Sequence, residues 1–349
     1  MTRSVQHPAT LEQVAAAARV SRATASRVVN GDQRVGGEAR AAVEEAIRVL
    51  GYVPNRAARS LVTRRSDSVA VVIPEPTDQL FGDPFFPRLL RGVTDVLEAG
   101  ETQLVLLMPQ SARDEDRLSR YLSAGHADGV LLASLHGDDP LPEDLQARGI
   151  PVVVGGRPRG QGITYVDVDN RGGAAAAVRH LLDAGRRRVA TIAGPQDMPA
   201  GADRLGGYRD AIAGSASGQE LIAEAGGFSF DAGRTAMEEL LAIAPDLDAV
   251  FVASDLMALG AVTALRVAGR RVPQEVAVVG FDDSPLAETM DPPLSSVRQP
   301  AEEMGREMTR LLLDAIRRRG GPPRRVILDT QLVIRASSDG AALNVEGSP

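Results

Sequence analysis

The stretch TLEQVAAAARVSRATASRVVNG, residues 10–31, has the pattern of two short helices joined by a tight turn. Thr10 is available as the N-cap of the first helix, and Ser21 can cap the second. Asn30 and Gly31 then form a C-cap signal that ends the second helix. Apolar residues recur on one face of each predicted helix, at Leu11, Val14, Ala15 and Ala18 and at Ala25, Val28 and Val29.

A third helix is predicted over residues 38–50, with Gly51 as its stop signal. Its apolar stripe consists of Val43, Ala46, Ile47 and Leu50. Three helices within about fifty residues, with a turn of two or three residues between the first pair, are the layout of a helix-turn-helix domain. The sequence therefore predicts an all-α DNA-binding head.

The second predicted helix turns Arg22, Ala23, Ser26 and Arg27 away from its buried face. A helix-turn-helix domain inserts the N-terminal end of this helix into the major groove. An arginine there can donate two hydrogen bonds to guanine, which discriminates between bases by roughly 1–3 kcal/mol. The alternative is that both arginines are solvated charges on a surface helix, and the surrounding pattern favours the DNA contact.

Charge is distributed unevenly along the 349 residues. The whole chain has a net charge of -7, yet residues 1–66 hold 11 arginines and 5 acidic residues and carry +6, which leaves -13 on the remainder. A basic head on an acidic body indicates that the head meets a polyanion, while the body limits non-specific binding.

The amino-acid composition excludes several kinds of functional site. The chain has no cysteine, which excludes disulfides, thiolate zinc sites and cysteine nucleophiles. All 39 basic residues are arginine, which excludes a P-loop lysine and a lysine Schiff base. The start MTRSVQHPAT lacks the apolar core of a signal peptide, and runs such as VAVVI are too short to cross a bilayer. We expect a cytoplasmic protein without membrane contact, metal or cofactor.

The segment GYVPNRAARSLVTRRSDSVAVVIP, residues 51–74, follows the predicted head. Pro54 favours an extended entry, Asn55 can cap, and RAARSL can form only one or two helical turns, too few to be stable alone. Together with residues 10–31, the motifs LGYVPNRAARSL and VAVVIP resemble the lactose-repressor family of bacterial transcription regulators. The resemblance implies a hinge helix that folds on specific DNA and places Leu61, with Ala58 one turn before it, in the minor groove.

One position departs from the family pattern, because Arg19 stands where the turn usually has glycine. If the turn still requires a left-handed residue, Arg19 carries strain of about 1 kcal/mol. Arg22 and Ala23 fall at the variable, base-reading positions of the family. The predicted DNA-contacting residues are Thr10, Ser21, Arg22, Ala23, Thr24, Ser26, Arg27, Asn30, Asn55, Ala58 and Leu61.

Residues 67–337 alternate short apolar strands, such as SVAVVI, with helical segments, such as PFFPRLLRGVTDVLEAG. This alternation predicts parallel sheets flanked by helices, and a second series from residue 170 gives two similar doubly wound α/β lobes. The resemblance implies a periplasmic-binding-protein-like core. The predicted division is a head of residues 1–52, a hinge of residues 53–66, a body of residues 67–337 and a flexible tail of residues 338–349. The predicted lobes are residues 67–166 with 296–322, and residues 167–295 with 323–337.

Ligands of open parallel sheets bind beyond the carboxyl ends of the strands, so the residues that follow the strands are candidates. That rule selects Asp83, Phe85, Phe86, Gly156, Arg157, Arg204, Phe228, Ser254 and Asp282. These positions match effector-contacting positions of the family, to which the resemblance adds Gln299. Aromatic rings against a sugar face, with arginine and aspartate on its hydroxyls, suit a polar ring. Ser254 replaces the usual asparagine and Gly156 the usual aspartate, which removes groups that bind the hydroxyls of a free hexose.

Three functions compete. An enzyme has little support, because the chain has no GxSxG, HExxH, P-loop or GxGxxG motif and its four histidines lack metal-binding spacing. A sugar-binding receptor would share the body but not the head. We expect a homodimer, or a tetramer, that reads a pseudo-palindromic DNA operator and is released by a sugar or related small polar effector. A co-repressor that strengthens DNA binding would use the same architecture.

Overall fold

The structure is a computed structural model of the chain, and it describes residues 9–29, 31–32, 34–52, 65–100, 102–215, 218–318 and 321–339. The chain divides into two compact units, Met1–Ser66 and Asp67–Pro349. We call the described part of the first unit the head and that of the second unit the body. Each unit has its own apolar core.

In its described residues the head forms three helices, α1 (Leu11–Ala17), α2 (Arg22–Val29) and α3 (Gly37–Leu50). Their apolar faces meet in one core, which contains Val14, Ala15, Ala18, Ala25, Val28, Val43 and Ala46. This is the helix-turn-helix arrangement that the sequence predicts. Of the predicted core positions, Leu11 and Ile47 are partly buried and pack against this core, whereas half-buried Val29 and Leu50, which is 39% exposed, are not part of it. Each of these last two is the final residue of its helix, where the packed face ends.

The turn between α1 and α2 contains a left-handed residue, Arg19, with a φ of 54°. The N–H of Arg19 donates to the carbonyl of Ala16 (3.2 Å), and the N–H of Val20 donates to the carbonyl of Ala15 (3.0 Å). These two bonds form a Schellman motif, which usually has glycine at the position that Arg19 occupies. The turn therefore still requires a left-handed residue, and Arg19 carries the expected strain.

The body is built on two sheets. Its strands within the described residues are β1 (Ser68–Val72), β2 (Gln103–Leu107), β3 (Gly129–Ala133), β4 (Val152–Gly155), β5 (Thr164–Val168), β6 (Val189–Ala193), β7 (Ile222–Glu224), β8 (Ala249–Val252), β9 (Ala277–Asp282), β10 (Ser295–Arg298), β11 (Arg325–Leu328) and β12 (Gln331–Val333). The first sheet has the order β11-β5-β4-β3-β1-β2, with every pair parallel. The second has the order β12-β10-β9-β8-β6-β7, in which β12 runs antiparallel to β10.

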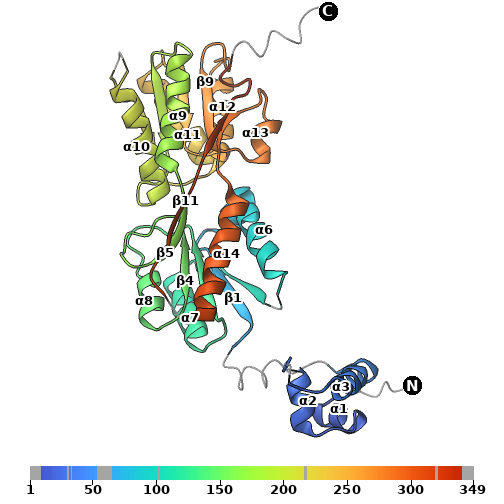
Figure 1. The fold of residues 1–349 in the computed structure, drawn as a ribbon. Coiled ribbons are helices and arrows are strands. Elements are labelled where there is room, and N and C mark those ends of the chain that lie inside the picture. The colour runs from blue at the N-terminus through green and yellow to red at the C-terminus, as the bar shows by residue number, and fades with distance from the viewer. Residues whose placement is uncertain are drawn as a thin grey trace, which may run out of the picture. The chain divides into compact units, whose positions relative to one another are not determined.

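Helices cover both faces of each sheet, as Figure 1 shows. Those described in the body are α5 (Thr77–Gly82), α6 (Phe85–Leu97), α7 (Ala112–Ser123), α8 (Leu141–Ala147), α9 (Asn170–Asp183), α10 (Pro199–Ala213), α11 (Phe230–Ile243), α12 (Asp255–Val267), α13 (Pro285–Thr289) and α14 (Ala301–Arg318). In the first lobe, α6 and α14 pack on one face of the sheet and α7 and α8 on the other. In the second lobe, α9 and α10 oppose α11 and α12. Central strands such as β3 and β8 are apolar and fully buried because both of their faces are covered, which is the predicted doubly wound architecture.

The structure corrects the predicted lobe boundaries. β10 belongs to the second sheet, so residues 296–298 lie in the second lobe and the chain crosses after Arg298. β11 pairs with β5 in the first sheet, so residues 325–328 lie in the first lobe. β11 and β12 are both short and partly exposed, and only their pairing partners distinguish the lobes to which they belong.

Candidate functional site

The exposed face of α2 carries predicted DNA contacts. Arg22, Ala23 and Arg27 are exposed, whereas Ala25 and Val28 on the opposite side are buried in the core of the head. The helix therefore offers two guanidinium groups to an outside partner while its apolar side holds it in place. A helix that enters the major groove needs this arrangement.

Ser21 and Thr10 cap the two helices of this motif. The Oγ of Ser21 accepts the N–H of Thr24 (3.0 Å) and lies 2.9 Å from the Thr24 hydroxyl. Thr10 and Gln13 form a capping box, in which each side chain accepts the other's backbone N–H. Because a hydroxyl has a proton and two lone pairs, the Thr10 side chain can contact a phosphate while it caps α1. Ser26, on α2, is half-buried.

Arg22 has a partner within the head, because its Nε lies 2.7 Å from Oε1 of Glu12 on α1. Both side chains are exposed, and such a pair contributes only ~0–1 kcal/mol. A DNA base can therefore replace Glu12 as the partner of Arg22 at little cost in free energy. The sequence prediction did not include Glu12. Four predicted DNA contacts lie outside the described residues, namely Asn30, Asn55, Ala58 and Leu61.

A cavity of about 480 Å³ lies between the two lobes of the body. Its lining includes all nine of the predicted effector contacts, Asp83, Phe85, Phe86, Arg157, Arg204, Phe228, Ser254, Asp282 and Gln299, together with Gly156. The strand ends explain why residues so far apart in sequence meet. Arg157 lies just beyond β4, Ser254 just beyond β8, and Asp282 ends β9. The carboxyl ends of parallel strands share one edge of a sheet, and the two sheets turn these edges toward the same cavity.

Arg204, on α10, is fixed in the wall of the cavity. Its Nε donates to Oδ1 of Asn170 (2.8 Å), and its Nη1 donates to the carbonyl of Ala253 (2.6 Å). The guanidinium carbon lies 3.7 Å from the ring centroid of Phe281. Burial lowers the pKa of Arg204, an effect opposed by the carboxylate of Asp282, whose Oδ1 lies 3.8 Å from Nη1. Because these contacts hold the guanidinium still, it can serve as a preorganised donor.

Three of the carboxyl groups that line the cavity, those of Asp83, Asp167 and Asp282, are buried. Burial raises the pKa of Asp83 to about 6, although its Oδ1 accepts the N–H of Phe85 (2.9 Å). Burial also raises the pKa of Asp167 and lifts that of Asp282 well above its usual range. The cavity thus crowds several carboxyl groups around Arg204. A ligand with many hydroxyl groups can satisfy them.

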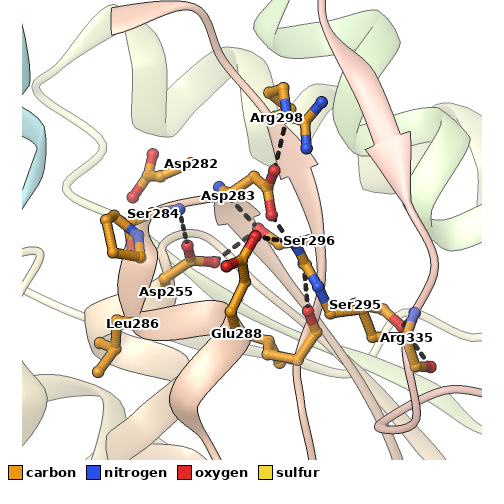
Figure 2. A network of polar contacts seen from close by, with 12 residues as sticks. Asp255, Asp282, Asp283, Ser284, Leu286, Glu288, Ser295, Ser296, Arg298 and Arg335 are labelled. Atoms are coloured by element: carbon orange, nitrogen blue, oxygen red, sulfur yellow. Dashed lines mark hydrogen bonds and ion pairs between the residues drawn. The ribbon is translucent and has the colours of Figure 1, made fainter.

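A strained turn directs Asp282 into the cavity. Asp282 and Asp283 both have positive φ, 111° and 45°, which is costly for residues other than glycine and persists only where neighbours hold it. Asp255 supplies part of that support, because its carboxylate accepts the N–H of Ser284 (2.7 Å) and the hydroxyl of Ser296 (2.6 Å). Burial raises the pKa of Asp255 to about 7. Figure 2 shows this network behind the turn, with the Asp282 carboxylate directed away from it.

Two arginines complete the support of the turn (Figure 2). The Nε of Arg298 lies 2.6 Å from Oδ2 of Asp283, and the Nη1 of Arg335 lies 2.7 Å from Oδ1 of Asp283. Arg335 also donates to the carbonyl of Leu294 (2.8 Å). Residues beyond β12 and at the end of β10 therefore hold the direction of a side chain in the cavity.

Aromatic rings form the apolar part of the lining. Phe85 and Phe86 pack edge to face, with ring centroids 5.3 Å apart. Phe228 lies near Arg204, whose guanidinium carbon is 5.5 Å from its ring centroid. Phe86 is buried, whereas Phe85 and Phe228 are half-buried and can offer ring surface to a ligand.

Several charged pairs bridge the lobes, and of their members the sequence predicted only Arg157 as a site residue. Arg157 donates from Nη2 to the Oδ2 of Asp203 on α10 (2.6 Å). His136 lies between Glu75 of its own lobe (Nε2 to Oε1, 3.2 Å) and Asp197 of the other lobe (Nδ1 to Oδ2, 2.9 Å). The hydrogen bonds to Glu75 and to Asp197 raise the pKa of His136 to about 9, so the ring is charged at neutral pH. Glu75 follows β1, and the strand-end rule would have found it.

Comparison with known proteins agrees with this arrangement. Residues 10–55 match the sequence pattern described as bacterial regulatory proteins, lacI family, and residues 178–338 match that of a periplasmic binding protein-like domain. The HTH-type transcriptional regulator CelR of Thermobifida fusca is 52% identical over 94% of this chain and 98% of its own length. The ribose operon repressor of Halalkalibacterium halodurans is 33% identical over 95% and 97%. The solved transcriptional regulator CelR-cellobiose complex is 50% identical, covers 94% of this chain and 99% of its own, and has a TM-score of 0.75.

A helix-turn-helix head together with a two-lobed, periplasmic-binding-protein-like body defines a DNA-binding regulator of transcription. The chain belongs to the lacI family of bacterial regulatory proteins. The predicted fold class and the predicted regulator function are therefore confirmed, and the family consists of transcription regulators. Within the part of the chain that the structure describes, no helix combines the length and apolarity needed to cross a membrane.

Proposed function

We propose that this regulator binds a pseudo-palindromic operator as a homodimer and that a sugar in the cavity of the body releases it. The proposal rests above all on one observation: the nine residues selected as effector contacts line a single cavity between two lobes. Two similar proteins support a sugar as the effector, since one is solved in complex with cellobiose and another is named a ribose operon repressor.

The chemistry of the lining suits a sugar. Phe85 and Phe228 offer half-buried ring surface for the C–H face of a pyranose, and Arg204 offers a fixed donor for its hydroxyls. The carboxyl groups of Asp83 and Asp282 already accept from the N–H of Phe85 and from the Gln299 side chain, and their remaining lone pairs can accept from the same hydroxyls. We assign Phe86, Arg157, Ser254 and Gln299 to the same site.

Lobe closure gives the sugar a route to control DNA binding. Ion pairs from Arg157 to Asp203 and from His136 to Asp197 already connect the two lobes. A sugar held by both lobes binds the closed body more tightly, so it shifts the population toward closure. By linkage, operator and sugar then weaken each other's binding by the same factor. We propose that residues 53–66 carry this change and that Leu61, with Ala58, wedges into the minor groove of the operator.

The operator contact requires two heads. A single small head buries too little surface to discriminate among the sites of a genome, whereas two half-sites multiply specificity. We assign base reading to Arg22 and Ala23, and contacts to the DNA to Thr10, Ser21, Thr24, Ser26, Arg27, Asn30 and Asn55. We further propose that the protein works in the cytoplasm, where the chromosome lies, and that it has no catalytic role.

Operator release tests the proposal. Full-length protein is titrated against an operator obtained by selection from a randomised DNA library, with fluorescence anisotropy as the readout and a panel of sugars added in turn. We expect at least one sugar to lower operator affinity, and Asp282→Ala to bind the operator normally without responding. If Asp282→Ala gives the wild-type dose response, the cavity is not the effector site. If operator affinity stays constant with every sugar, the sugar effector is wrong.

A further inference from the structure

We propose that Glu12, on α1, is a further specificity-determining residue of the head and that it reads one G·C base pair of the operator jointly with Arg22. Arg22 donates to the guanine, and the Glu12 carboxylate accepts from the amino group of the paired cytosine. The inference rests on the proposed function, because it adds a residue from a second helix to the DNA contact of α2.

An ion pair places Glu12 beside the first residue of α2. Oε1 of Glu12 lies 2.7 Å from Nε of Arg22, and the side chains are 61% and 71% exposed. Among the described residues the Arg22 side chain has no other ion pair or hydrogen bond, so its Nη1 and Nη2 can donate to an outside acceptor. A guanine can therefore join this pair without displacing Glu12.

The backbone on both sides of the pair is held in place. A capping box between Thr10 and Gln13 fixes the first turn of α1, which contains Glu12. Ser21 accepts the N–H of Thr24 (3.0 Å) and so fixes the start of α2. The two helices also share the apolar core of the head. Packing therefore sets the distance between the two charged side chains before DNA arrives.

A G·C base pair matches the hydrogen-bonding groups of this ion pair. In the major groove guanine presents the acceptors N7 and O6, and cytosine presents an amino donor on N4. Arginine binds N7 and O6 of guanine, and a carboxylate accepts from N4 of cytosine. Because O6 and N4 are hydrogen-bonded to each other in the base pair, a carboxylate held on the guanidinium that binds O6 lies beside N4. An A·T pair presents acceptor, donor and acceptor, which this ion pair does not match.

The charge of Glu12 also disfavours DNA of any other sequence. A carboxylate is an acceptor only, and the phosphates of DNA repel it. Residues 1–66 carry a net charge of +6, and an acid beside the base-reading Arg22 weakens the non-specific attraction that this charge creates. The cytosine amino group offsets the repulsion at the correct base pair alone. Glu12 therefore raises the ratio of specific to non-specific affinity.

Chemically modified operators test the contact with cytosine. Full-length protein is titrated against the operator selected from a randomised library, with N4-methylcytosine placed at the base pair whose preference Arg22→Ala relaxes. The methyl group replaces the N4 proton that faces the major groove and leaves the pairing with guanine intact. We expect the modification to raise the wild-type Kd about five- to 30-fold and to leave the Kd of Glu12→Ala within about two-fold.

Base preference and non-specific affinity provide a second test. In a randomised-site selection Glu12→Ala should relax the same base pair as Arg22→Ala, and the double variant should lose less affinity than the product of the two single losses. Affinity for random-sequence DNA should rise about two- to five-fold in Glu12→Ala, because one repulsive charge is removed. Glu38→Ala is the matched control, since Glu38 is the second residue of α3, as Glu12 is of α1, and is likewise exposed.

The outcomes separate this inference from the proposed function. A wild-type base preference in Glu12→Ala, a relaxation at a different base pair from that of Arg22→Ala, or an equal change in Glu38→Ala would overturn the role of Glu12. An N4-methylcytosine penalty that persists in Glu12→Ala would do the same. Operator binding as proposed stands in each of these cases. If the wild-type protein selects no preferred sequence at all, the inference and the proposed function are both wrong.

Discussion

Replacing Arg19 with glycine should stabilise the head. Arg19 is the left-handed residue of a Schellman motif, and its side chain is exposed, so the change removes a Cβ clash without removing buried surface. The left-handed conformation costs ~1–2 kcal/mol for a residue with a Cβ, whereas glycine adds ~0.4–1 kcal/mol of unfolded-state entropy. The net gain is about 1 kcal/mol.

Thermal unfolding of a fragment of residues 1–66, followed by circular dichroism, measures this gain. For so small a unit, about 1 kcal/mol corresponds to a rise of ~4–8 °C in Tm. Hydrogen exchange at the Val14 amide of the full chain provides a second readout, since that residue is fully buried in the head.

Gly51→Ala is the reverse control. Gly51 ends α3 with a φ of 60°, and a Cβ there would meet no atom within 4 Å, so the substitution adds backbone strain alone. We expect it to lower Tm by a similar amount. A lower Tm for Arg19→Gly, or an unchanged Tm for Gly51→Ala, would refute the reasoning from left-handed strain.

Three further predictions concern the two sites. Arg22→Ala should relax base preference at one operator position per half-site, at a cost of roughly 1–3 kcal/mol, and an unchanged preference in a randomised-site selection would contradict its role. Burial raises the pKa of Asp83 to about 6 from 3.8, so its ionisation opposes folding as pH rises through that range. Asp83→Asn should therefore raise the unfolding free energy by about 2–3 kcal/mol at pH 7 and leave it unchanged below pH 4. The same substitution should weaken sugar binding. If urea denaturation at pH 7 shows a lower unfolding free energy for Asp83→Asn than for the wild type, this account of Asp83 is wrong. His136 has a raised pKa, so its bonds to Glu75 and Asp197 contribute stability below pH 6.5 that is lost as pH rises through about 9. After allowance for solvent screening, His136→Gln should lower the unfolding free energy by about 1 kcal/mol at pH 7, and a difference that persists at pH 10 would contradict this account.

Much of the fold could be predicted from local pattern. The helical spacing of Val14, Ala25 and Val43 defines the core of the head, because a helix repeats its buried face every three or four residues. Apolar strands alternating with helices likewise require parallel sheets covered on both faces. The candidate cavity residues other than Gln299, which the family resemblance supplied, were selected in the same way, since parallel strands end at one edge of a sheet whatever their order.

Strand partners and contacts across the lobes needed the tertiary structure. β11 and β12 look alike in sequence, and the first pairs with β5 while the second pairs with β10. Nothing near Arg157 in the chain indicates that Asp203 will neutralise it, because the two meet only when the lobes come together.

The sequence by itself determined that this chain has a helix-turn-helix head and a two-lobed α/β body, because periodicity and strand-end chemistry are local properties. Only the tertiary structure decided which charges face one another. The turn at Asp282 and Asp283 shows why: its direction depends on Asp255 and Arg335, residues distant in the chain that the sheet order brings behind it. The energy of an interaction between two charges depends on the distance between them in space, and packing rather than sequence separation determines that distance.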